Sequence, residues 1–218
     1  MRAQFVRSAA HPAEYPGDGL AELAVVGRSN VGKSTLVNRL AAARIARTSA
    51  APGKTRTLNV YRLEPAGERP FHLVDLPGYG YARGGSVSAD AFEALTRDYF
   101  GFRTAGRTAP GSGHRPPAAF AALLLVDGRH PGLESDVHAH DWLAALEIPL
   151  GVVATKIDKL TRAERSRAQH AFERAFTTPV LPLSAATGEG LKELWILIAR
   201  LLNSPPPPPR PKRQPSSS

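Results

Sequence analysis

The sequence predicts an α/β fold: a mostly parallel sheet of six strands, covered by helices on both faces and containing one antiparallel strand. Two observations support this prediction. Runs such as LAVVG and AAFAALLLVD are apolar throughout, as strands buried on both faces are, and amphipathic helical patterns separate them. The chain has 218 residues, which is enough for one domain with a well-buried core and marginal for two.

The expected strands and helices alternate along the chain. A strand at 23–27 leads through a glycine-rich turn into a helix at 33–43, whose Leu36, Val37 and Leu40 fall on one face. Strands at 57–64 and 71–75, separated by the turn PAGERP, predict a hairpin and so account for the antiparallel strand. Further strands are expected at 118–127, 150–158 and 179–185. Further helices are expected at 88–100, 134–147, 161–176 and 190–202.

Three segments fall outside these elements. Residues 1–20 are expected to form an N-terminal arm in front of a domain that spans 21–202. Within that domain, residues 104–117 (TAGRTAPGSGHRPP) predict a loop that is long for an ordinary connection. Residues 203–218 begin with a polyproline run and end in basic residues and serines, which predicts an extended, disordered tail.

The composition limits the classes of function. The chain has no cysteine, which excludes disulfide scaffolds, thiolate metal sites and cysteine nucleophiles, and which fits a cytoplasmic protein. No apolar run is long enough to cross a bilayer or to act as a secretory signal, so we expect no membrane partner. The formal charge of +9 predicts attraction to a polyanion, most often nucleic acid, although a basic surface also serves solubility alone.

The stretch GRSNVGKS at 27–34 matches the phosphate-binding pattern G-x-x-x-x-G-K-[ST]. It lies between an expected strand and an expected helix, where the mechanism requires it. Gly27 and Gly32 allow the backbone N–H groups to converge on a phosphate, and the helix N-terminus adds partial positive charge. Lys33 supplies a full charge to the β- and γ-phosphates, and the Ser34 hydroxyl is a ligand for Mg²⁺.

The stretch DLPGYGYA at 75–82 follows the second strand of the hairpin. Asp75 is placed to hold a water molecule bound to Mg²⁺, and Gly78 leaves its N–H free for a γ-phosphate. The segment APGKTRTLNV lies between the two motifs, and we expect Thr55 to reach Mg²⁺ with its hydroxyl when a triphosphate is bound. Thr57 is the weaker candidate for that role because it already begins a strand.

Two further motifs favour guanine over adenine. Asp158 in TKID at 155–158 can accept hydrogen bonds from guanine N1–H and its 2-amino group, whereas adenine would leave the carboxylate desolvated and unpaired. The stem of Lys156 can lie across the base. Thr155 stands where asparagine is more usual, and its hydroxyl can still tie two loops together. In SAA at 184–186, the backbone N–H of Ala185 can meet guanine O6.

Together these motifs resemble the EngB family (also called YihA or YsxC) of bacterial GTP-binding proteins. The stretches that carry the resemblance are GRSNVGKSTLVN, PGKTRTLNVY, DLPGYGYA, VDGRHP, TKIDKL and PLSAATGEG, within residues 20–202. The long 104–117 loop and the tail depart from the family pattern. The resemblance implies a Ras-like P-loop GTPase domain that binds GTP or GDP with Mg²⁺ and hydrolyses GTP slowly. It also implies a role in assembly of the large ribosomal subunit and in normal septation.

The expected site follows from the motifs and from this resemblance. Lys33, Thr55 and Gly78 are the expected catalytic residues. Mg²⁺ is expected on Ser34 and Thr55, and on Asp75 through water. The expected GTP-binding residues are Gly27, Arg28, Ser29, Asn30, Val31, Gly32, Lys33, Ser34, Gly53, Lys54, Thr55, Arg56, Thr57, Asp75, Leu76, Pro77, Gly78, Thr155, Lys156, Ile157, Asp158, Ser184, Ala185 and Ala186.

Two details of the site extend these expectations. Asn30 resembles residues of GTPases that use K⁺ beside the phosphates, so K⁺ is a possible further cofactor; the alternative is a solvent-facing loop residue. Tyr79 follows Gly78 and cannot orient a water molecule as glutamine would, which predicts slow hydrolysis by the protein alone. We expect Tyr79 and Tyr81 to rearrange when Gly78 engages the γ-phosphate and to present an aromatic surface to a partner.

The leading hypothesis is a monomeric GTPase switch that docks on the large-subunit precursor, that is, on its rRNA and ribosomal proteins. A second is a nucleotide-gated binding protein in cell division for which hydrolysis is dispensable. A third is an ATP-using P-loop enzyme, which Asp158 argues against. The stretch DVHAHDW suggests a metal site, but a solvated helix face is the favoured interpretation. The stripe of Arg167, His170 and Arg174 is either an RNA phosphate contact or a solvated face.

Overall fold

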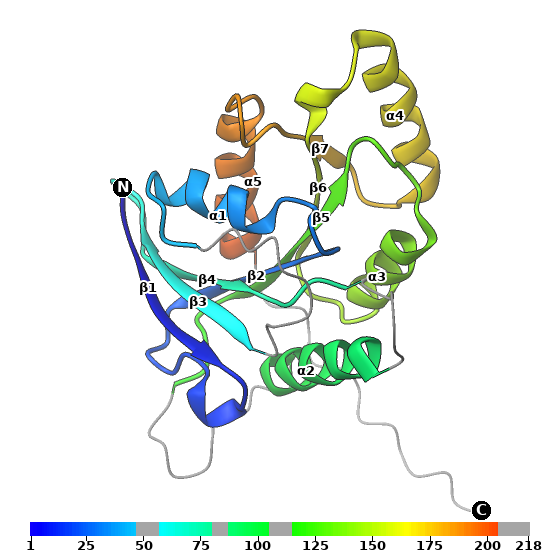
Figure 1. Ribbon diagram of the computed structural model, residues 1–218. Coiled ribbons are helices and arrows are strands. Elements are labelled where there is room, and N and C mark those ends of the chain that lie inside the picture. Colours follow the sequence, from blue (N-terminus) through cyan, green and yellow to red (C-terminus); the bar gives the residue numbers. More distant parts are fainter. Residues whose placement is uncertain (47–56, 80–86, 105–114, 205–218) are drawn as a thin grey trace, which may run out of the picture.

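The computed structural model describes residues 1–46, 57–79, 87–104 and 115–204, and it contains one seven-stranded sheet in the order β1-β3-β4-β2-β5-β6-β7 (Figure 1). The strands are β1 (Arg2–Ala9), β2 (Ala21–Gly27), β3 (Leu58–Glu64), β4 (Phe71–Asp75), β5 (Phe120–Asp127), β6 (Leu150–Thr155) and β7 (Val180–Pro182). The α-helices are α1 (Lys33–Ala41), α2 (Val87–Thr104), α3 (Glu134–Ala144), α4 (Arg162–Ala175) and α5 (Leu191–Asn203). Short 3₁₀ helices lie at η1 (Pro12–Glu14) and η2 (Ile157–Lys159).

The sheet confirms the predicted α/β class. Strands β4, β2, β5, β6 and β7 pair in parallel, and β3 pairs antiparallel with β4 as the expected hairpin. Strand β1 pairs antiparallel with β3 as well, so among the described strands β3 alone runs against the others. The structure therefore has one strand more than the six that the sequence predicts.

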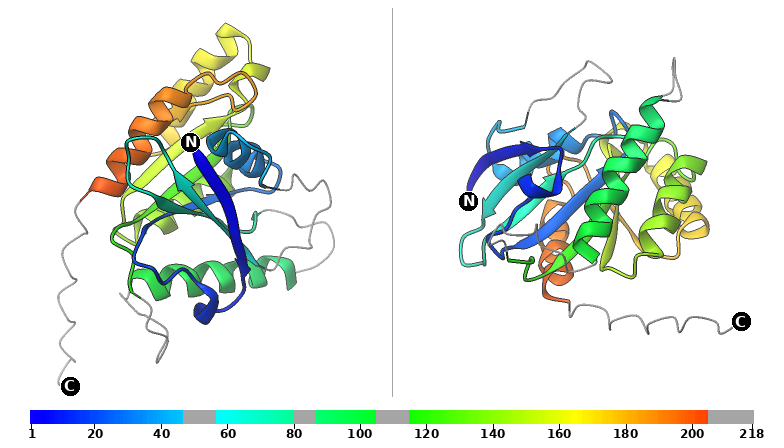
Figure 2. Two further views of the ribbon diagram at one scale, coloured as in Figure 1. Left: turned by 90° about the vertical axis from the view of Figure 1, so that its left-hand side faces the viewer. Right: turned by 90° about the horizontal axis from the view of Figure 1, so that it is seen from below.

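Helices cover both faces of the sheet. Figure 1 and the two views of Figure 2 show α1 and α5 on one face, and α2, α3 and α4 on the other. Leu36 of α1 and Leu194 of α5 belong to the core on the first face, and both are fully buried. Phe100 of α2, Leu143 of α3 and Phe172 of α4 belong to the core on the second face. Burial on both sides explains why the central strands are apolar throughout.

The segment predicted as an N-terminal arm is largely part of the fold. Strand β1 lies at one edge of the sheet, and most of its side chains are exposed. After η1, the side chain of Tyr15 is buried and packs edge-on against Tyr99 and Phe102 of α2, with ring centroids 5.1 and 5.6 Å apart. Most of the 104–117 loop and nearly all of the 203–218 tail lie outside the described residues.

The parallel strands bring their carboxyl ends to a common edge of the sheet, where ligands of open α/β sheets bind. At that edge, β2 ends at Gly27, β4 at Asp75, β5 at Asp127 and β6 at Thr155. The motifs that the sequence singles out therefore meet at one place. In the described parts of the chain, no helix is both long enough and apolar enough to span a bilayer.

Candidate nucleotide site

The phosphate loop at 27–34 joins β2 to α1. Gly32 caps the helix at a φ of 113°, a value that L side chains rarely adopt, and Asn30 has a φ of 63°. A Cβ atom on Gly27 would lie 2.8 Å from the carbonyl oxygen of Leu125, so only glycine fits there. The loop thus presents the N-terminus of α1 at the carboxyl edge of the sheet, as an anion site requires.

Lys33 and Asp75 are two charged residues beside this loop whose charges influence each other. Lys33 Nζ donates to the carbonyl oxygen of Gly27 at 3.3 Å. Burial lowers the pKa of Lys33, and the charge of Asp75 acts against that shift. Burial raises the pKa of Asp75 to about 6, with Lys33 acting in the opposite direction. Asp75 is buried, and its Oδ1 has no hydrogen-bond partner among the described residues.

A buried carboxylate oxygen without a partner is costly unless a ligand satisfies it. Asp75 ends β4 at the sheet edge where α1 begins with Lys33 and Ser34, and oxygen is the donor that Mg²⁺ prefers. The described residues therefore fit a site for Mg²⁺. The third expected ligand, Thr55, and the neighbouring candidates Gly53, Lys54 and Arg56 lie outside the described residues, while Thr57 lies directly before β3.

The segment after β4 lies against the phosphate loop. The N–H of Leu76 donates to Val25 O at 3.1 Å, and the N–H of Ser29 donates to Tyr79 O at 2.9 Å. Gly78 lies between these two attachments, and a Cβ atom on it would come within 2.8 Å of the backbone nitrogen of Ser29. Gly78 is thus held directly beside the loop that is expected to bind phosphate.

Tyr79 does not point toward solvent. Its side chain is buried, and its hydroxyl donates to Oδ1 of Asp136 in the first turn of α3, at 2.8 Å. The favoured interpretation of α3 as a solvated face is wrong for two residues, because Asp136 and His140 are both buried. His140 contacts the Thr178 hydroxyl and Asp141, each at 3.1 Å. Tyr79 and Thr178, the partners of Asp136 and His140, come from segments that are distant in the sequence. The spacing of residues along α3 therefore could not predict that these two side chains are buried.

The TKID motif is tied to the phosphate loop. The hydroxyl of Thr155 donates to Val31 O at 2.7 Å and lies 3.1 Å from Val126 O, so it joins the end of β6 to the phosphate loop and to β5. Lys156 has a φ of 61°, and its Nζ donates to Asn30 O and, at 2.8 Å, to Asp127 Oδ2. The TKID motif and the phosphate loop are therefore directly connected.

Asp127 is a site residue to which the sequence assigns no role. It is buried, and Arg129 holds it in a two-pronged pair with distances of 2.8 and 2.9 Å. Burial acts to raise the pKa of Asp127, but the hydrogen bonds from Arg129 and Lys156 outweigh it and lower the pKa well below its usual range. An aspartate at the end of an apolar strand was the available signal, within the VDGRHP stretch.

Asp158 is oriented by the SAA segment. The Ser184 hydroxyl donates to Asp158 Oδ1 at 2.7 Å, and this hydrogen bond lowers the pKa of Asp158. Ser184 is itself held, because its N–H donates to Glu189 O at 2.9 Å and its Oγ accepts from the N–H of Thr187 at 3.1 Å. The carboxylate that is expected to read guanine is therefore charged and fixed in position.

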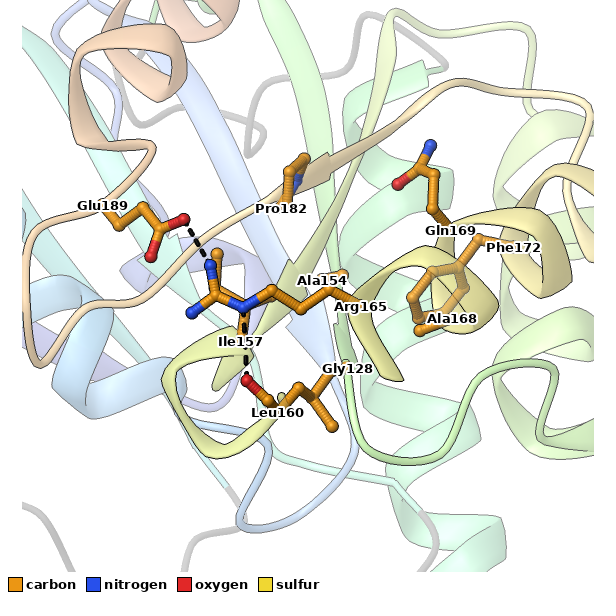
Figure 3. A pocket seen from close by; sticks show the side chains of 10 residues that line it. All are labelled: Gly128, Ala154, Ile157, Leu160, Arg165, Ala168, Gln169, Phe172, Pro182 and Glu189. Carbon is orange, nitrogen blue, oxygen red and sulfur yellow. Dashed lines mark hydrogen bonds and ion pairs between the residues drawn. The ribbon is translucent and has the colours of Figure 1, made fainter. Parts of the chain in front are cut away.

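A pocket of about 220 Å³ lies behind these loops on the α4 side (Figure 3). Its lining is mostly apolar. Arg165 lies across it, pairing with Glu189 at 2.6 Å and pointing Nε at the carbonyl oxygen of Leu160. The lining residues are Gly128, Ala154, Ile157, Leu160, Arg165, Ala168, Gln169, Phe172, Pro182 and Glu189. The pocket does not contain the phosphate loop, so it is a neighbour of the site rather than the site itself.

The structure brings the described members of the expected site to one edge of the sheet. Three apolar members, Val31, Leu76 and Ile157, bury their side chains in the core, so they can meet a nucleotide only through their backbone. Tyr81, which was expected to act with Tyr79, lies outside the described residues.

Comparisons with known proteins give a consistent family. Residues 22–156 match the model of a family described as 50S ribosome-binding GTPase. The chain is 36% identical over 205 residues to the probable GTP-binding protein EngB of Oceanobacillus iheyensis, covering 92% of this chain and 96% of the relative. It is 39% identical to the probable EngB of Solibacter usitatus, covering 94% and 98%. A crystal structure of a probable EngB protein superposes with a TM-score of 0.59 at 25% identity, covering 84% of this chain and 98% of that one.

Proposed function

This chain belongs to the EngB family of GTP-binding proteins and is a GTPase, and from that premise we propose that it is a Mg²⁺-dependent switch in assembly of the large ribosomal subunit. The observation that carries the proposal is Asp75. Its buried oxygen, which has no hydrogen-bond partner in the described part of the chain, lies beside the phosphate loop, at the same end of the sheet as Asp158 and Ser184, the pair proposed to read guanine.

Phosphate binding is proposed to rest on three groups. The N–H groups at the start of α1 bind phosphate oxygens, and Lys33 adds a full positive charge to the β- and γ-phosphates. The N–H of Gly78 contacts the γ-phosphate. Ser34 and Thr55 would hold Mg²⁺ directly and Asp75 through water; bound there, Mg²⁺ would neutralise charge on the phosphate oxygens. We propose that the remaining residues of the expected GTP-binding set make further contacts with the nucleotide.

Slow hydrolysis is expected because the residue after Gly78 is Tyr79. Tyr79 is engaged with Asp136 and has no group that could aim a water molecule. An additional positive group supplied to the phosphates is worth roughly 10³–10⁵ in rate in related switches, and we propose that the protein turns over slowly until such a group is supplied. We propose that K⁺ beside Asn30 or a docked partner supplies it. Equal turnover in KCl and NaCl would exclude the K⁺ half of this proposal.

The proposed partner is a large-subunit precursor, with its rRNA and ribosomal proteins. The description of the matching family and the net charge of +9 support it. On this proposal the protein works as a monomer in the cytoplasm, and its role in ribosome assembly also makes it necessary for normal cell division.

The experiment is GTP turnover by the purified chain with and without precursor large-subunit particles. The switch predicts accelerated turnover and binding of the GTP form that weakens steeply with salt. The second candidate, a nucleotide-gated binding protein, predicts nucleotide-dependent binding with no acceleration. Particles that neither bind nor accelerate would exclude both, and competition between GTP and ATP would expose an ATP-using enzyme.

A further inference from the structure

A buried hydrogen bond joins the segment after β4 to helix α3. The Tyr79 hydroxyl donates to Asp136 Oδ1 at 2.8 Å, although the two residues are 57 positions apart in the sequence. Tyr79 is 8% exposed and Asp136 is 1% exposed, so water competes little for either group. Hydrogen bonds to a charged acceptor are stronger than neutral ones, and losing such a partner inside a protein is costly.

This bond lies next to the glycine that is expected to sense the γ-phosphate. Leu76 is attached to β2 through Val25, and the carbonyl oxygen of Tyr79 is attached to the N–H of Ser29. Only two residues separate these attachments, and Gly78 is one of them. The position of the Tyr79 side chain therefore influences the position of Gly78 relative to the phosphate loop.

Asp136 also faces the phosphate loop. Its own N–H donates to Leu133 O at 2.9 Å in the first turn of α3, where the helix favours a negative charge. Burial raises the pKa of Asp136, while the hydrogen bond from Tyr79 and the charge of Arg28 act in the opposite direction. Arg28 belongs to the phosphate loop, and its buried Nε has no hydrogen-bond partner in the described part of the chain. One carboxylate thus interacts with both segments that surround the expected phosphates.

We propose that Tyr79 and Asp136 are positioning residues that hold Gly78 ready for the γ-phosphate and so make the protein favour GTP over GDP. This inference rests on the proposed function, in which the N–H of Gly78 contacts that phosphate. GDP has no γ-phosphate and makes no use of Gly78. Loosening the Tyr79–Asp136 bond therefore weakens GTP binding and leaves GDP binding nearly unchanged.

The test compares Kd values for a non-hydrolysable GTP analogue and for GDP, both with Mg²⁺. For Tyr79→Phe, the expected result is roughly tenfold weaker binding of the analogue and less than about twofold change for GDP. Asp136→Asn should lose less, because its amide oxygen still accepts the hydroxyl. The double variant should lose no more than Tyr79→Phe alone, because both substitutions act on one interaction.

Tyr99→Phe is the matched control. The Tyr99 hydroxyl donates a hydrogen bond to the buried Glu22 at 2.7 Å. Glu22 lies near the start of β2, at the end of the parallel strands opposite to Asp75. This variant should lower thermal stability without changing the ratio of the two Kd values. A Tyr79→Phe ratio within about twofold of wild type, or an equal loss for both nucleotides, overturns the inference while leaving the proposed function intact. A wild-type protein that binds neither nucleotide overturns the proposed function and the inference with it.

Discussion

Two buried carboxylates lie at opposite ends of the neighbouring parallel strands β2 and β4, and they differ in how their oxygens are satisfied. Glu22, at the start of β2, accepts the Tyr99 hydroxyl at 2.7 Å and forms a two-pronged pair with Arg103 at 2.7 and 2.9 Å. Asp75, at the end of β4, has Lys33 as its nearby charge and one oxygen without a partner among the described residues. Protein groups alone therefore satisfy the Glu22 carboxylate, whereas we propose that a ligand satisfies the free oxygen of Asp75.

The pKa values alone do not distinguish a structural carboxylate from one that is proposed to bind a ligand. Burial raises the pKa of Glu22 to about 7 and that of Asp75 to about 6. What differs is the surroundings. Arg103 also donates to Pro16 O at 2.8 Å and lies over the rings of Tyr15 and Phe102, so its pair with Glu22 ties α2 and the N-terminal segment to β2. For these two carboxylates the complete hydrogen bonds of Glu22 support a structural role, and the unpartnered oxygen of Asp75 supports the proposed ligand site.

The substitution Arg103→Leu should have the largest effect on stability. It removes the counter-charge of a buried carboxylate, so Glu22 must either keep an unpaired charge or take up a proton at pH 7.5, and the loss costs about 3–5 kcal/mol of unfolding free energy. Urea unfolding at pH 7.5 measures this loss, and GTP affinity of the folded variant should stay within about twofold of wild type. Arg129→Leu is the control, because Arg129 is half-exposed and Asp127 keeps Lys156 as a partner. A loss below about 1 kcal/mol for Arg103→Leu would show that the pair is not structural.

Asp75→Asn should give the reverse pattern. GTP affinity in the presence of Mg²⁺ should fall by roughly 10–100-fold, because the neutral amide is a poorer partner for a metal-bound water. Stability of the nucleotide-free protein should stay the same or rise, since no charge is then buried. Isothermal titration and urea unfolding measure the two quantities, with Glu22→Gln as the matched change at the other end of the strands. Normal GTP affinity in Asp75→Asn would remove Asp75 from the proposed site.

The pH dependence of stability sharpens the role of Glu22. The pKa of Glu22 in the folded protein, about 7, lies above its ordinary value of 4.5. The folded state therefore keeps the proton to higher pH than the unfolded chain, so the Glu22 contribution is greatest below pH 4.5 and is lost as the pH rises through 7. Without the charge of Arg103 that pKa rises further, and the deficit of Arg103→Leu should grow between pH 5 and pH 8.5. Urea unfolding midpoints across this pH range measure the stability deficit. A deficit that does not change with pH would contradict the role given to Glu22. The stability of Glu22→Gln should depend less on pH than that of the wild type.

The smallest effect is expected for Ser184→Ala. Asp158 loses the hydroxyl that orients it, and GTP affinity should fall about fivefold, in line with one lost hydrogen bond to a charged group whose side chain stays partly solvated. Fluorescent-nucleotide titration measures the change. Ser204→Ala, at the end of α5, is a control that removes an exposed hydroxyl and should leave affinity unchanged. A Ser184→Ala variant with wild-type affinity would mean that the Ser184–Asp158 bond does not support base reading.

Local signals explain what the sequence could predict. The phosphate loop is recognised because its glycines and lysine stand at fixed spacing between a strand and a helix, and the role of the Thr155 hydroxyl follows from its place at the end of β6. Strand β1 gives no such signal: its side chains are mostly exposed, and it joins the sheet through backbone pairing with β3, across a register shift between Phe5 and Arg7. The partner of Asp136 could not be predicted either, because Tyr79 is brought to it only by folding.

The most direct test of the central claim, that this sheet edge reads a guanine nucleotide, is a titration of wild type and Asp158→Asn with GTP and XTP. Xanthine carries a carbonyl where guanine carries the 2-amino group, so an asparagine amide can pair with it and a carboxylate cannot. The account predicts that wild type binds GTP at least about 100-fold more tightly than XTP, and that Asp158→Asn reverses the preference. An Asp158→Asn protein that still preferred GTP by the wild-type factor would contradict it.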